Sequence, residues 1–441
     1  NNGYGKLTIT GSEESSEKVN VNNFEVSTTA AIFVLDAATS GSGAAGGLAG
    51  LCEYGIVNIK NVNATNLTVA GENVRDVGGL IAAGRINSDS IDINNCLLDS
   101  VRVTVYNKQT TKDNNVGGVI GFTQKPLKIS NVTIKNNSYV SGQKFAGGFV
   151  GSAYKSVTIQ DCEENSTNIQ ATLNWVGGFI GYVSSSMTAT FNNCQEENVN
   201  ILGRYAGGFV GAVDGNITAS NMELVKVMTV INNNIIKDFR CAGLITGKAT
   251  NSIKCYNILA DSCKTGYNKT SGGGNLSTSE IQEIPTSGFW IGQSETGSTI
   301  NLTAVAAKGD VFPQKDIGTQ NGSATIIYAD ASVDQKYNPT KTTDKPSSSA
   351  APWLDVNPKS DVPFADGTVM TGNGAGTGTA SQILGDLKAE NPSSAYYWNL
   401  KDNKAELAKF LDSTNDAYVT TYRSEENKTT TVDKKVDFPV L

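Results

Sequence analysis

The sequence predicts an all-β protein: a right-handed parallel β-helix, or solenoid, with a small α+β segment at its C-terminus. Three repeated features lead to this prediction. A glycine pair recurs along the chain, a short phrase of alternating apolar and polar residues follows each pair, and a weaker strand-like segment follows the phrase. Repeats of roughly 20 to 50 residues are typical of stacked units, because one unit cannot bury its own apolar face.

The glycine pair sets the period of the repeat. Its three central steps, with copies reading GGVIG, GGFVG, GGFIG and GGFVG, are each 30 residues long. The copies begin at Gly46, Gly78, Gly117, Gly147, Gly177, Gly207 and, more loosely, at Ala242 and Gly288. Glycine at a fixed place in each unit predicts a corner of the coil.

The alternating phrase predicts the main strand of each coil. Copies such as VTIQDC from Val157 and ATFNNC from Ala189 have apolar residues at every second position. This period of two gives a strand with one buried face, whereas a helix would need a period near 3.6. With the glycine-led strand and the trailing strand, each unit has three strands. Residues 1–330 are therefore predicted to form about nine coils.

Other all-β folds are less consistent with the sequence. A propeller blade needs four strands in roughly forty residues, with tight antiparallel hairpins. Hairpin turns of the Asn-Gly or Asp-Gly type are few, and VDGNIT at Asp214 is the clearest. The β-helix is therefore preferred to a propeller or a sandwich.

An asparagine or aspartate occupies a fixed place near the end of each phrase. Asn tolerates the left-handed backbone that a sharp corner demands, and stacked amides can hydrogen-bond between coils. We expect a structural ladder, with a row of ligand-binding amides as the alternative. Its members are Asn23, Asn61, Asn95, Asn131, Asp161, Asn193, Asn221 and Asn257.

The seven cysteines are predicted to be mostly buried, reduced thiols. Cys96, Cys162 and Cys194 fall in the apolar slot that follows the ladder residue, where free cysteine behaves as a small hydrophobe. A disulfide between Cys255 and Cys263, which are close in sequence, is the alternative for that pair.

Two apolar columns follow the glycine pair, one containing Phe149 and Phe179 and the other Val150 and Ile180. Adjacent residues on a straight strand point to opposite faces. Either a corner turns both columns inward, or one lies outside and is covered. We expect coverage by another part of the chain.

The C-terminal quarter is predicted to leave the repeat. Residues 331–380 are rich in Pro, Ser, Thr and Gly and are interpreted as a linker or covering segment. Within residues 381–441, helices are expected from Ser381 and from Asp402. This part is either a small α+β cap or junction module, or an extension of the same domain. The start without methionine and the apolar end VDFPVL suggest a piece of a longer polypeptide with neighbouring domains.

Composition excludes several functions. Histidine is absent, which removes the commonest general base and the usual zinc ligand. Lys and Arg number 35 against 42 Asp and Glu, so nucleic acid is not an expected partner. No stretch is long and apolar enough for a membrane span.

The pairing of GGFVG or GGFIG with a following NC or DC resembles the GLUG-motif repeats of large bacterial cell-surface proteins. The resemblance covers about residues 44–250. It implies a secreted or surface-anchored, adhesin-like protein with solenoid structure, and it supplies no catalytic residues. The spacing of 32 and then 39 residues between Gly46, Gly78 and Gly117 departs from the 30-residue step, so the extra residues are expected to form loops.

A carbohydrate-active β-helix enzyme, either a polysaccharide lyase or a glycoside hydrolase, is the alternative. It would need clustered carboxylates on neighbouring coils, or a basic residue with acids that hold calcium. The candidates are Asp89, Asp92, Asp161, Arg85 and Arg204. The polar slots of the phrase form no acidic column: Lys60, Asn94, Ser130, Gln160, Asn192 and Ser220. The glycine-rich run from Thr371 lacks the lysine of a phosphate loop. No catalytic, cofactor or metal residue is predicted.

The function expected from the sequence is a non-enzymatic extracellular surface module, an adhesin or rigid spacer. Its expected partners are host or microbial surface components, including carbohydrate on the uncharged polar strand face.

Overall fold

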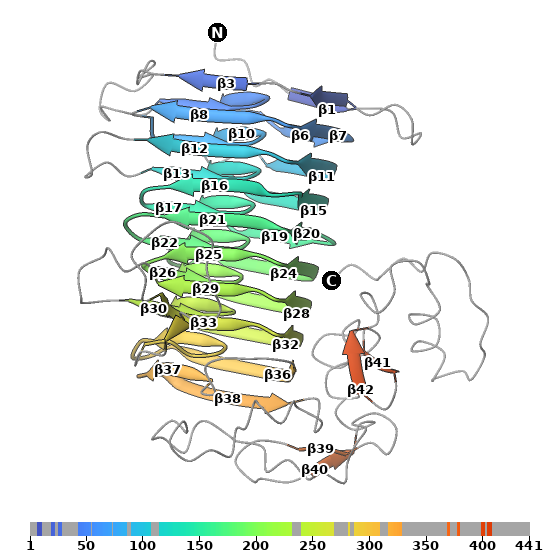
Figure 1. The fold of residues 1–441 in the computed structure, drawn as a ribbon, viewed down its shortest axis with the longest axis vertical. Helices are drawn as coiled ribbons and strands as arrows, with labels where there is room; N and C mark the ends of the chain where they lie inside the picture. The colour runs from blue at the N-terminus through green and yellow to red at the C-terminus, as the bar shows by residue number, and fades with distance from the viewer. Residues whose placement is uncertain are drawn as a thin grey trace, which may run out of the picture.

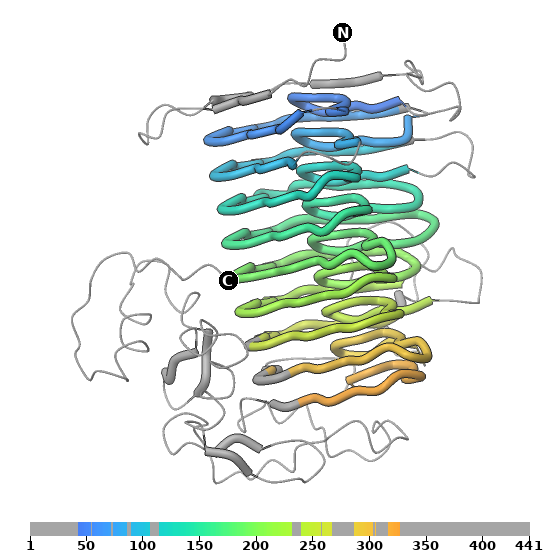
Figure 2. Tube along the Cα trace, turned by 180° about the vertical axis from the view of Figure 1, so that it is seen from behind, coloured from blue at the N-terminus to red at the C-terminus, as the bar shows by residue number. Residues whose placement is uncertain are grey.

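The computed structural model describes 7–10, 19–22, 25–28, 43–53, 55–72, 74–85, 90–106, 114–231, 240–268, 281–282, 286–308, 316–328, 368–370, 377–379, 398–401 and 404–407. These residues contain strands and no helix. The strands form a parallel β-helix whose coils stack along the long axis, as predicted (Figures 1 and 2).

Sheet A is the longest wall of the β-helix and holds thirteen strands. All of its strand pairs are parallel, and successive coils pair in register, as Ile129 does with Ile159. Its strands are β1 (Leu7–Thr10), β2 (Val19–Asn22), β6 (Val57–Lys60), β7 (Val62–Thr65), β11 (Ile91–Asp99), β15 (Leu127–Lys135), β19 (Val157–Gln160), β20 (Glu163–Asn165), β24 (Thr188–Glu197), β28 (Asn216–Val225), β32 (Ser252–Asp261), β36 (Thr299–Lys308) and β38 (Ser323–Tyr328).

Sheet B follows sheet A in each coil and holds nine strands, of which only the last pair is antiparallel. They are β3 (Glu25–Thr28), β8 (Thr68–Glu72), β12 (Arg102–Tyr106), β16 (Ser138–Gly142), β21 (Thr167–Ala171), β25 (Asn200–Gly203), β29 (Met228–Ile231), β33 (Lys264–Asn268) and β34 (Ile281–Gln282).

Sheets C and D carry the two halves of the glycine phrase. Sheet C has seven strands: β4 (Ala44–Gly46), β9 (Asp76–Gly78), β13 (Asn115–Gly117), β17 (Phe145–Gly147), β22 (Trp175–Gly177), β26 (Tyr205–Gly207) and β30 (Cys241–Gly243). Sheet D has nine: β5 (Ala49–Cys52), β10 (Ile81–Gly84), β14 (Ile120–Thr123), β18 (Val150–Ala153), β23 (Ile180–Val183), β27 (Val210–Val213), β31 (Thr246–Ala249), β35 (Ile291–Ser294) and β37 (Ile317–Gln320).

The glycine pair forms the tip of an arch that joins sheet C to sheet D. A Cβ added to Gly147 would lie 2.0 Å from the Val150 carbonyl oxygen, so the two strands of the arch approach at backbone distance. A Cβ on Gly208 would lie 3.0 Å from the Leu224 side chain of sheet A. The arch therefore points its tip into the β-helix, where only glycine leaves enough room.

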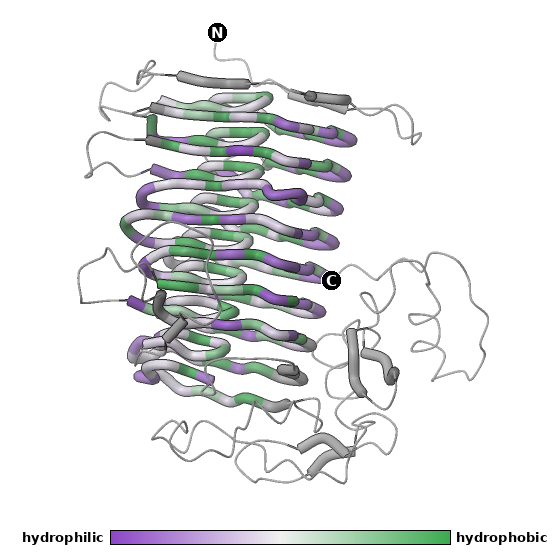
Figure 3. Tube along the Cα trace, in the orientation of Figure 1, coloured by the Kyte–Doolittle hydropathy of each residue, from purple (hydrophilic) through white to green (hydrophobic). Residues whose placement is uncertain are grey.

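The inward arch explains the two apolar columns. Phe149 at the tip and Val150 at the start of β18 are both fully buried in the same core cluster. The expectation that one column lies outside under a covering segment is wrong, because the turn directs both into the core. Figure 3 shows the alternation of apolar and polar residues along the outer strands.

The asparagine ladder is confirmed as a structural corner. The ladder residues from Asn61 to Asn221 have φ between +51° and +58°, the left-handed region. The Asn95 amide donates to Asn61 Oδ1 at 2.5 Å, and the Asn193 amide donates to Asp161 Oδ1 at 3.0 Å. Asn23 and the side chain of Asn257 lie outside the described residues.

A second left-handed column, not predicted, lies between sheets A and B. Its members share φ between +52° and +59° and are Asn66, Ser100, Asn136, Asn137, Ser166, Asn198, Lys226 and Ser262. Sheet A is therefore bent at the ladder and ends at a second corner of the same backbone geometry.

All seven cysteines are free and buried, so Cys255 and Cys263 form no disulfide. Cys96, Cys162 and Cys194 lie in the main core, as predicted.

The C-terminal segment differs from the prediction where it is described. Lys404–Leu407 forms strand β42, which pairs antiparallel with β41 (Trp398–Lys401), so the helix expected from Asp402 is wrong there. The two residues between these strands, Asp402 and Asn403, are types that favour hairpin connections. A second antiparallel pair joins β39 (Thr368–Met370) to β40 (Thr377–Thr379). The helix expected from Ser381 and most of residues 331–441 lie outside the described residues.

Candidate binding seam on the outer face of the arch

A line of aromatic and charged side chains runs along the stack at the open side of the arch. We call it the aromatic seam. It consists of the first residue of each sheet C strand and the residue before that strand, together with the third residue of each sheet D strand and the residue after that strand. In-register pairing brings these positions from successive coils next to one another, as it does Phe145 and Trp175.

The central coils of the seam carry a continuous group of rings. The Trp175 ring stacks on Tyr182 with centroids 4.7 Å apart, and it lies 4.8 Å from Phe145. Tyr154 lies 6.0 Å from Tyr182, and Tyr205 lies 6.1 Å from Trp175. Phe145, Tyr182 and Tyr205 form a small core cluster separate from the main core.

Two of these rings reach solvent. Tyr154 is 38% exposed, and Trp175 is half-buried against the cluster. The seam therefore combines a rigid buried base with exposed aromatic surface. Aromatic surface that is held rigid suits the apolar faces of sugar rings, because little side-chain entropy is lost on contact.

Cationic side chains flank the rings on the sheet C side. The Arg75 guanidinium lies 5.2 Å from the Phe122 ring centroid, and the Arg204 guanidinium lies 5.6 Å from Tyr205. The Lys144 ammonium lies 5.0 Å from Phe145 and 5.9 Å from Trp175. These cations are half-buried and sit at the edge of the aromatic surface.

The N-terminal end of the seam is a buried polar network. Asp76 is fully buried. It accepts one hydrogen bond from Arg85 and one from Asn115, each of 2.6 Å. Burial raises the pKa of Asp76, although Arg85 and Arg75 oppose the shift. The Ser152 hydroxyl donates to Asn115 Oδ1 and extends the network to the aromatic part.

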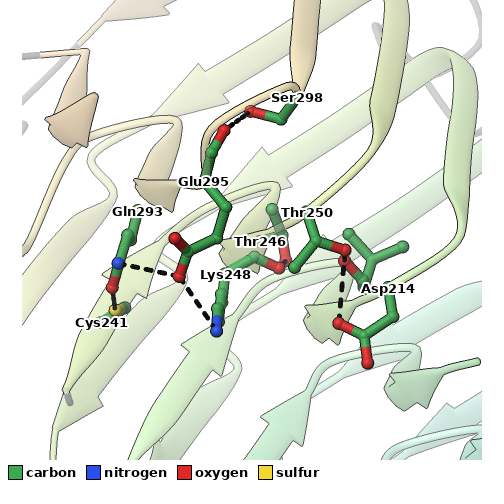
Figure 4. Close-up of polar contacts among 9 residues, drawn as sticks. Asp214, Cys241, Thr246, Lys248, Thr250, Gln293, Glu295 and Ser298 are labelled. Atoms are coloured by element: carbon green, nitrogen blue, oxygen red, sulfur yellow. Dashed lines mark hydrogen bonds and ion pairs between the residues drawn. The ribbon is translucent and has the colours of Figure 1, made fainter. Parts of the chain in front are cut away.

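The C-terminal end is polar and includes two carboxylates (Figure 4). Lys248 pairs with Glu295 at 3.0 Å, and Gln293 donates to Glu295 at 3.1 Å. Burial alone would lower the pKa of Lys248, but the hydrogen bond and charge of Glu295 outweigh it and raise the pKa. Asp214 accepts hydrogen bonds from Tyr182 at 2.7 Å and Thr250 at 3.3 Å.

Tyr182, Tyr205 and the Cys241 thiol are held neutral. Burial, then the neighbouring Asp214, raises the pKa of Tyr182, and burial raises the pKa of Tyr205. Burial also raises the pKa of Cys241 to about 12, and its thiol donates to Gln293 Oε1 at 2.9 Å. Cys241 therefore does not supply a thiolate nucleophile.

A second unusual group lies in the main core. Glu164 and Glu196 pair in register on adjacent coils, and both side chains are buried. Their carboxylate oxygens face the glycine tips at Gly148 and Gly178. Burial raises the pKa of both well above the ordinary value, and the charge of Glu164 raises that of Glu196 further. Because both side chains are buried in the core, we do not include this pair in the candidate site; its effect is on the pH dependence of stability.

The candidate residues predicted for catalysis do not meet at one site. Asp92 is in β11 of sheet A and Asp161 is at the bend between β19 and β20 of the same sheet, whereas Arg85 and Arg204 lie on the aromatic seam. Asp89 lies outside the described residues.

The polar slot of the phrase, expected to face carbohydrate, is used mainly inside the protein. Asn94 donates to Ser130 at 2.7 Å, and Ser220 donates to Asn192 at 3.1 Å, each across one coil. Ser130, Gln160, Asn192 and Ser220 are buried. This row therefore offers less ligand-binding surface than the sequence suggested.

Sequence reasoning missed the aromatic seam, although a signal was present. Phe145, Trp175 and Tyr205 each stand two residues before a glycine pair and recur every 30 residues. An aromatic column at the repeat period, next to glycines that must pack closely, indicates side chains on the opposite face from the core.

Comparison with family models, curated proteins and solved structures gives no match to the chain. Among the described residues, no cluster of three or more His, Cys, Asp or Glu side chains could hold a metal ion. The same residues include no helix that is long and apolar enough to span a membrane.

Proposed function

We propose that this chain is a non-enzymatic extracellular surface module, an adhesin-like domain that binds carbohydrate along the aromatic seam. The observation that carries the proposal is the ring series from Tyr154 through Tyr182 to Trp175, which is fixed by stacking and partly exposed. The resemblance of the repeats to GLUG-motif surface proteins supports the extracellular setting.

The shape of the molecule supports a binding or spacer role. Each coil adds about 4.8 Å to the length of the stack, so the seam is a long, straight surface that can contact an extended chain at several points. Several weak contacts to one chain sum to a useful affinity, since later contacts form within the same complex.

Binding to neutral and acidic polysaccharides by affinity electrophoresis and calorimetry tests the proposal. Tyr154→Ala removes the most exposed ring of the seam and is expected to weaken binding about fivefold, corresponding to about 1 kcal/mol. Ile56 is 45% exposed and precedes β6 on sheet A, so Ile56→Ala is the matched control and should bind as the parent does. Equal affinity of the two variants would remove the seam from the proposal.

The enzyme alternative makes a different prediction for the same samples. Asp214 and Glu295 are two carboxylates on the sheet D side of the seam, two coils apart. Depolymerisation of any polysaccharide that is abolished by Asp214→Asn or Glu295→Gln would replace the binding proposal with a catalytic one. We expect no new reducing ends or unsaturated products.

A further inference from the structure

On the sheet C side of the seam, the first cations are arranged with a period of two coils. The column just outside sheet C reads Arg75, Asn114, Lys144, Asn174 and Arg204, so a cation alternates with an asparagine. Arg240 follows in the next coil and ends the alternation.

Backbone hydrogen bonds fix this column in register. The amides of Asn115, Phe145, Trp175, Tyr205 and Cys241 donate to the carbonyl oxygens of the column residue one coil earlier, at 2.7, 3.1, 2.8, 3.1 and 3.0 Å. Adjacent members are therefore about 4.8 Å apart, and the cations are separated by about 9 to 10 Å along the axis.

The asparagines between the cations bond to their neighbours in the column. The Asn114 side-chain oxygen accepts from the Lys144 amide at 3.1 Å, and Arg204 donates to the Asn174 side-chain oxygen at 3.4 Å. The alternation is thus built into the rim of the seam.

We infer that the seam selects a linear acidic polysaccharide in which a carboxylated sugar alternates with a neutral one, lying along the β-helix axis. This inference rests on the proposed carbohydrate-binding function. A sugar residue in an extended chain is about as long as one coil. A polymer with a carboxylate on every second sugar then brings its charges to Arg75, Lys144 and Arg204. Its neutral sugars lie over the intervening coils, where Asn114 is buried and Asn174 is half-buried, so neither position places a charge at the surface.

The acids of the seam limit the extent of this site. Asp76 is buried and pairs with Arg85 at 2.6 Å and more loosely with Arg75 at 3.9 Å, so it presents little charge to a ligand. Asp214 and Glu295 lie on the sheet D side in the later coils, where they disfavour a polyanion. The chain as a whole carries a net charge of −7, which repels a polyanion at long range. The attraction between the cation column and the carboxylates of the polymer must therefore act locally, within a screening length of about 8 to 10 Å.

The test compares three polymers on the whole chain. Hyaluronan has a carboxylate on alternate sugars, polygalacturonate has one on every sugar, and a linear β-glucan has none. Hyaluronan is expected to bind at least tenfold more tightly than the β-glucan at low salt, and more tightly than polygalacturonate at equal chain length. The advantage should shrink as salt is raised.

Substitutions at and around Lys144 distinguish register from net charge. Lys144→Ala should weaken hyaluronan binding about threefold or more, whereas Lys128→Ala, on the outer face of sheet A, should not change it. The double variant Lys144→Asn with Asn174→Lys keeps the charge but moves it by one coil, and it should bind hyaluronan no better than Lys144→Asn alone. Circular dichroism and thermal unfolding establish that each variant is folded.

The outcomes separate this inference from the function on which it rests. If the seam binds neutral glucan and loses affinity in Tyr154→Ala, but shows no preference for hyaluronan, carbohydrate binding stands and the acidic selection is wrong. Full hyaluronan affinity in the charge-shifted double variant would also overturn the inference, because the two-coil register would then not matter. If none of the three polymers binds, both proposals fail for these ligand classes.

Discussion

At the scale of single residues, the fold depends on positions that most side chains could not occupy. Asn193 has φ of +54° and donates through its amide to Asp161 one coil earlier at 3.0 Å. It therefore satisfies two demands, a left-handed backbone and a polar contact along the stack. Other L-residues meet the first demand only with strain of roughly 1 kcal/mol.

Replacement of Asn193 separates these two contributions. Asn193→Ala introduces the left-handed strain and loses the amide, so its midpoint of thermal unfolding should fall by several degrees, for a cost of about 1–3 kcal/mol. Asn193→Gly loses the amide without strain and should be less destabilised. Thermal unfolding followed by circular dichroism measures both. A glycine variant that is less stable than the alanine variant would contradict the left-handed strain argument.

The buried pair of Glu164 and Glu196 gives a residue-scale prediction about pH. The folded pKa of both is well above the ordinary value of 4.5, mainly through burial. At pH below about 4.5 folded and unfolded states are both protonated. As the pH rises above that value the unfolded state releases protons that the folded state retains, so stability falls with rising pH up to the folded pKa.

Glu196→Leu should remove most of this loss of stability at neutral pH. Leu224 and Ile134 occupy the same core slot on nearby coils, so leucine is expected to fit. We expect a gain of about 1–3 kcal/mol in the free energy of unfolding at pH 7 and a much smaller gain at pH 4. Glu163→Leu, at an exposed neighbouring position, is the control. A gain that is the same at both pH values would indicate packing alone.

At the scale of the elements, the arch between sheets C and D decides both the core and the seam. The close approach of the two strands restricts the second position of the sheet D strand, which is glycine in the central coils and Ala82 in β10. A Cβ on Gly181 would lie 2.5 Å from the Gly151 carbonyl oxygen, whereas one on Gly50, at the same place in an earlier coil, would meet its nearest atom at 3.5 Å. The same coil position is therefore restrictive in the centre of the stack and permissive near its N-terminal end.

Gly181→Ala and Gly50→Ala form a matched pair. Gly181→Ala must displace backbone and should cost about 2–3 kcal/mol or more, the range of overpacking effects. It should also disturb the Tyr182 and Trp175 rings and weaken carbohydrate binding. Gly50→Ala should be close to neutral in thermal unfolding and in binding. Equal effects of the two substitutions would show that the arch is not limited by this contact.

At the scale of the whole molecule, the periodicity of the sequence predicted the β-helix, the ladder and the burial of the thiols, because each depends on local residue type. The inward arch could not be predicted from periodicity or local residue type. Period-two alternation places adjacent residues on opposite faces. Contacts in the structure, such as that of Gly208 with Leu224 of sheet A, are needed to show that the turn enters the core. The seam was missed for the same reason, since its outer face exists only once the arch is formed.

The cation alternation also needed the structure. Arg75 and Lys144 are separated by 69 residues and Lys144 and Arg204 by 60, and the longer first interval hides their common place in the coil. The helix expected from Asp402 failed because a short apolar stripe in a polar segment fits a hairpin strand as well as a helix.

The stack as a whole should open from its ends, and the buried thiols can report this. In a solenoid each coil is held mainly by its neighbours, so a terminal coil has fewer contacts to lose than a central one. Cys52 lies in β5 near the N-terminal end and retains 7% exposure, whereas Cys194 lies in β24 at the centre and is fully buried. Burial raises the pKa of Cys52, so its reaction also depends on opening.

Alkylation in low concentrations of denaturant, followed by mass spectrometry, measures the order of opening. We expect Cys52 to react at least tenfold faster than Cys194 below the unfolding midpoint, and all seven thiols to react at one rate above it. Reducing agent should leave the unfolding temperature unchanged, because none of the cysteines is paired. Equal rates for Cys52 and Cys194 at every denaturant concentration would show instead that the coils unfold as one cooperative unit.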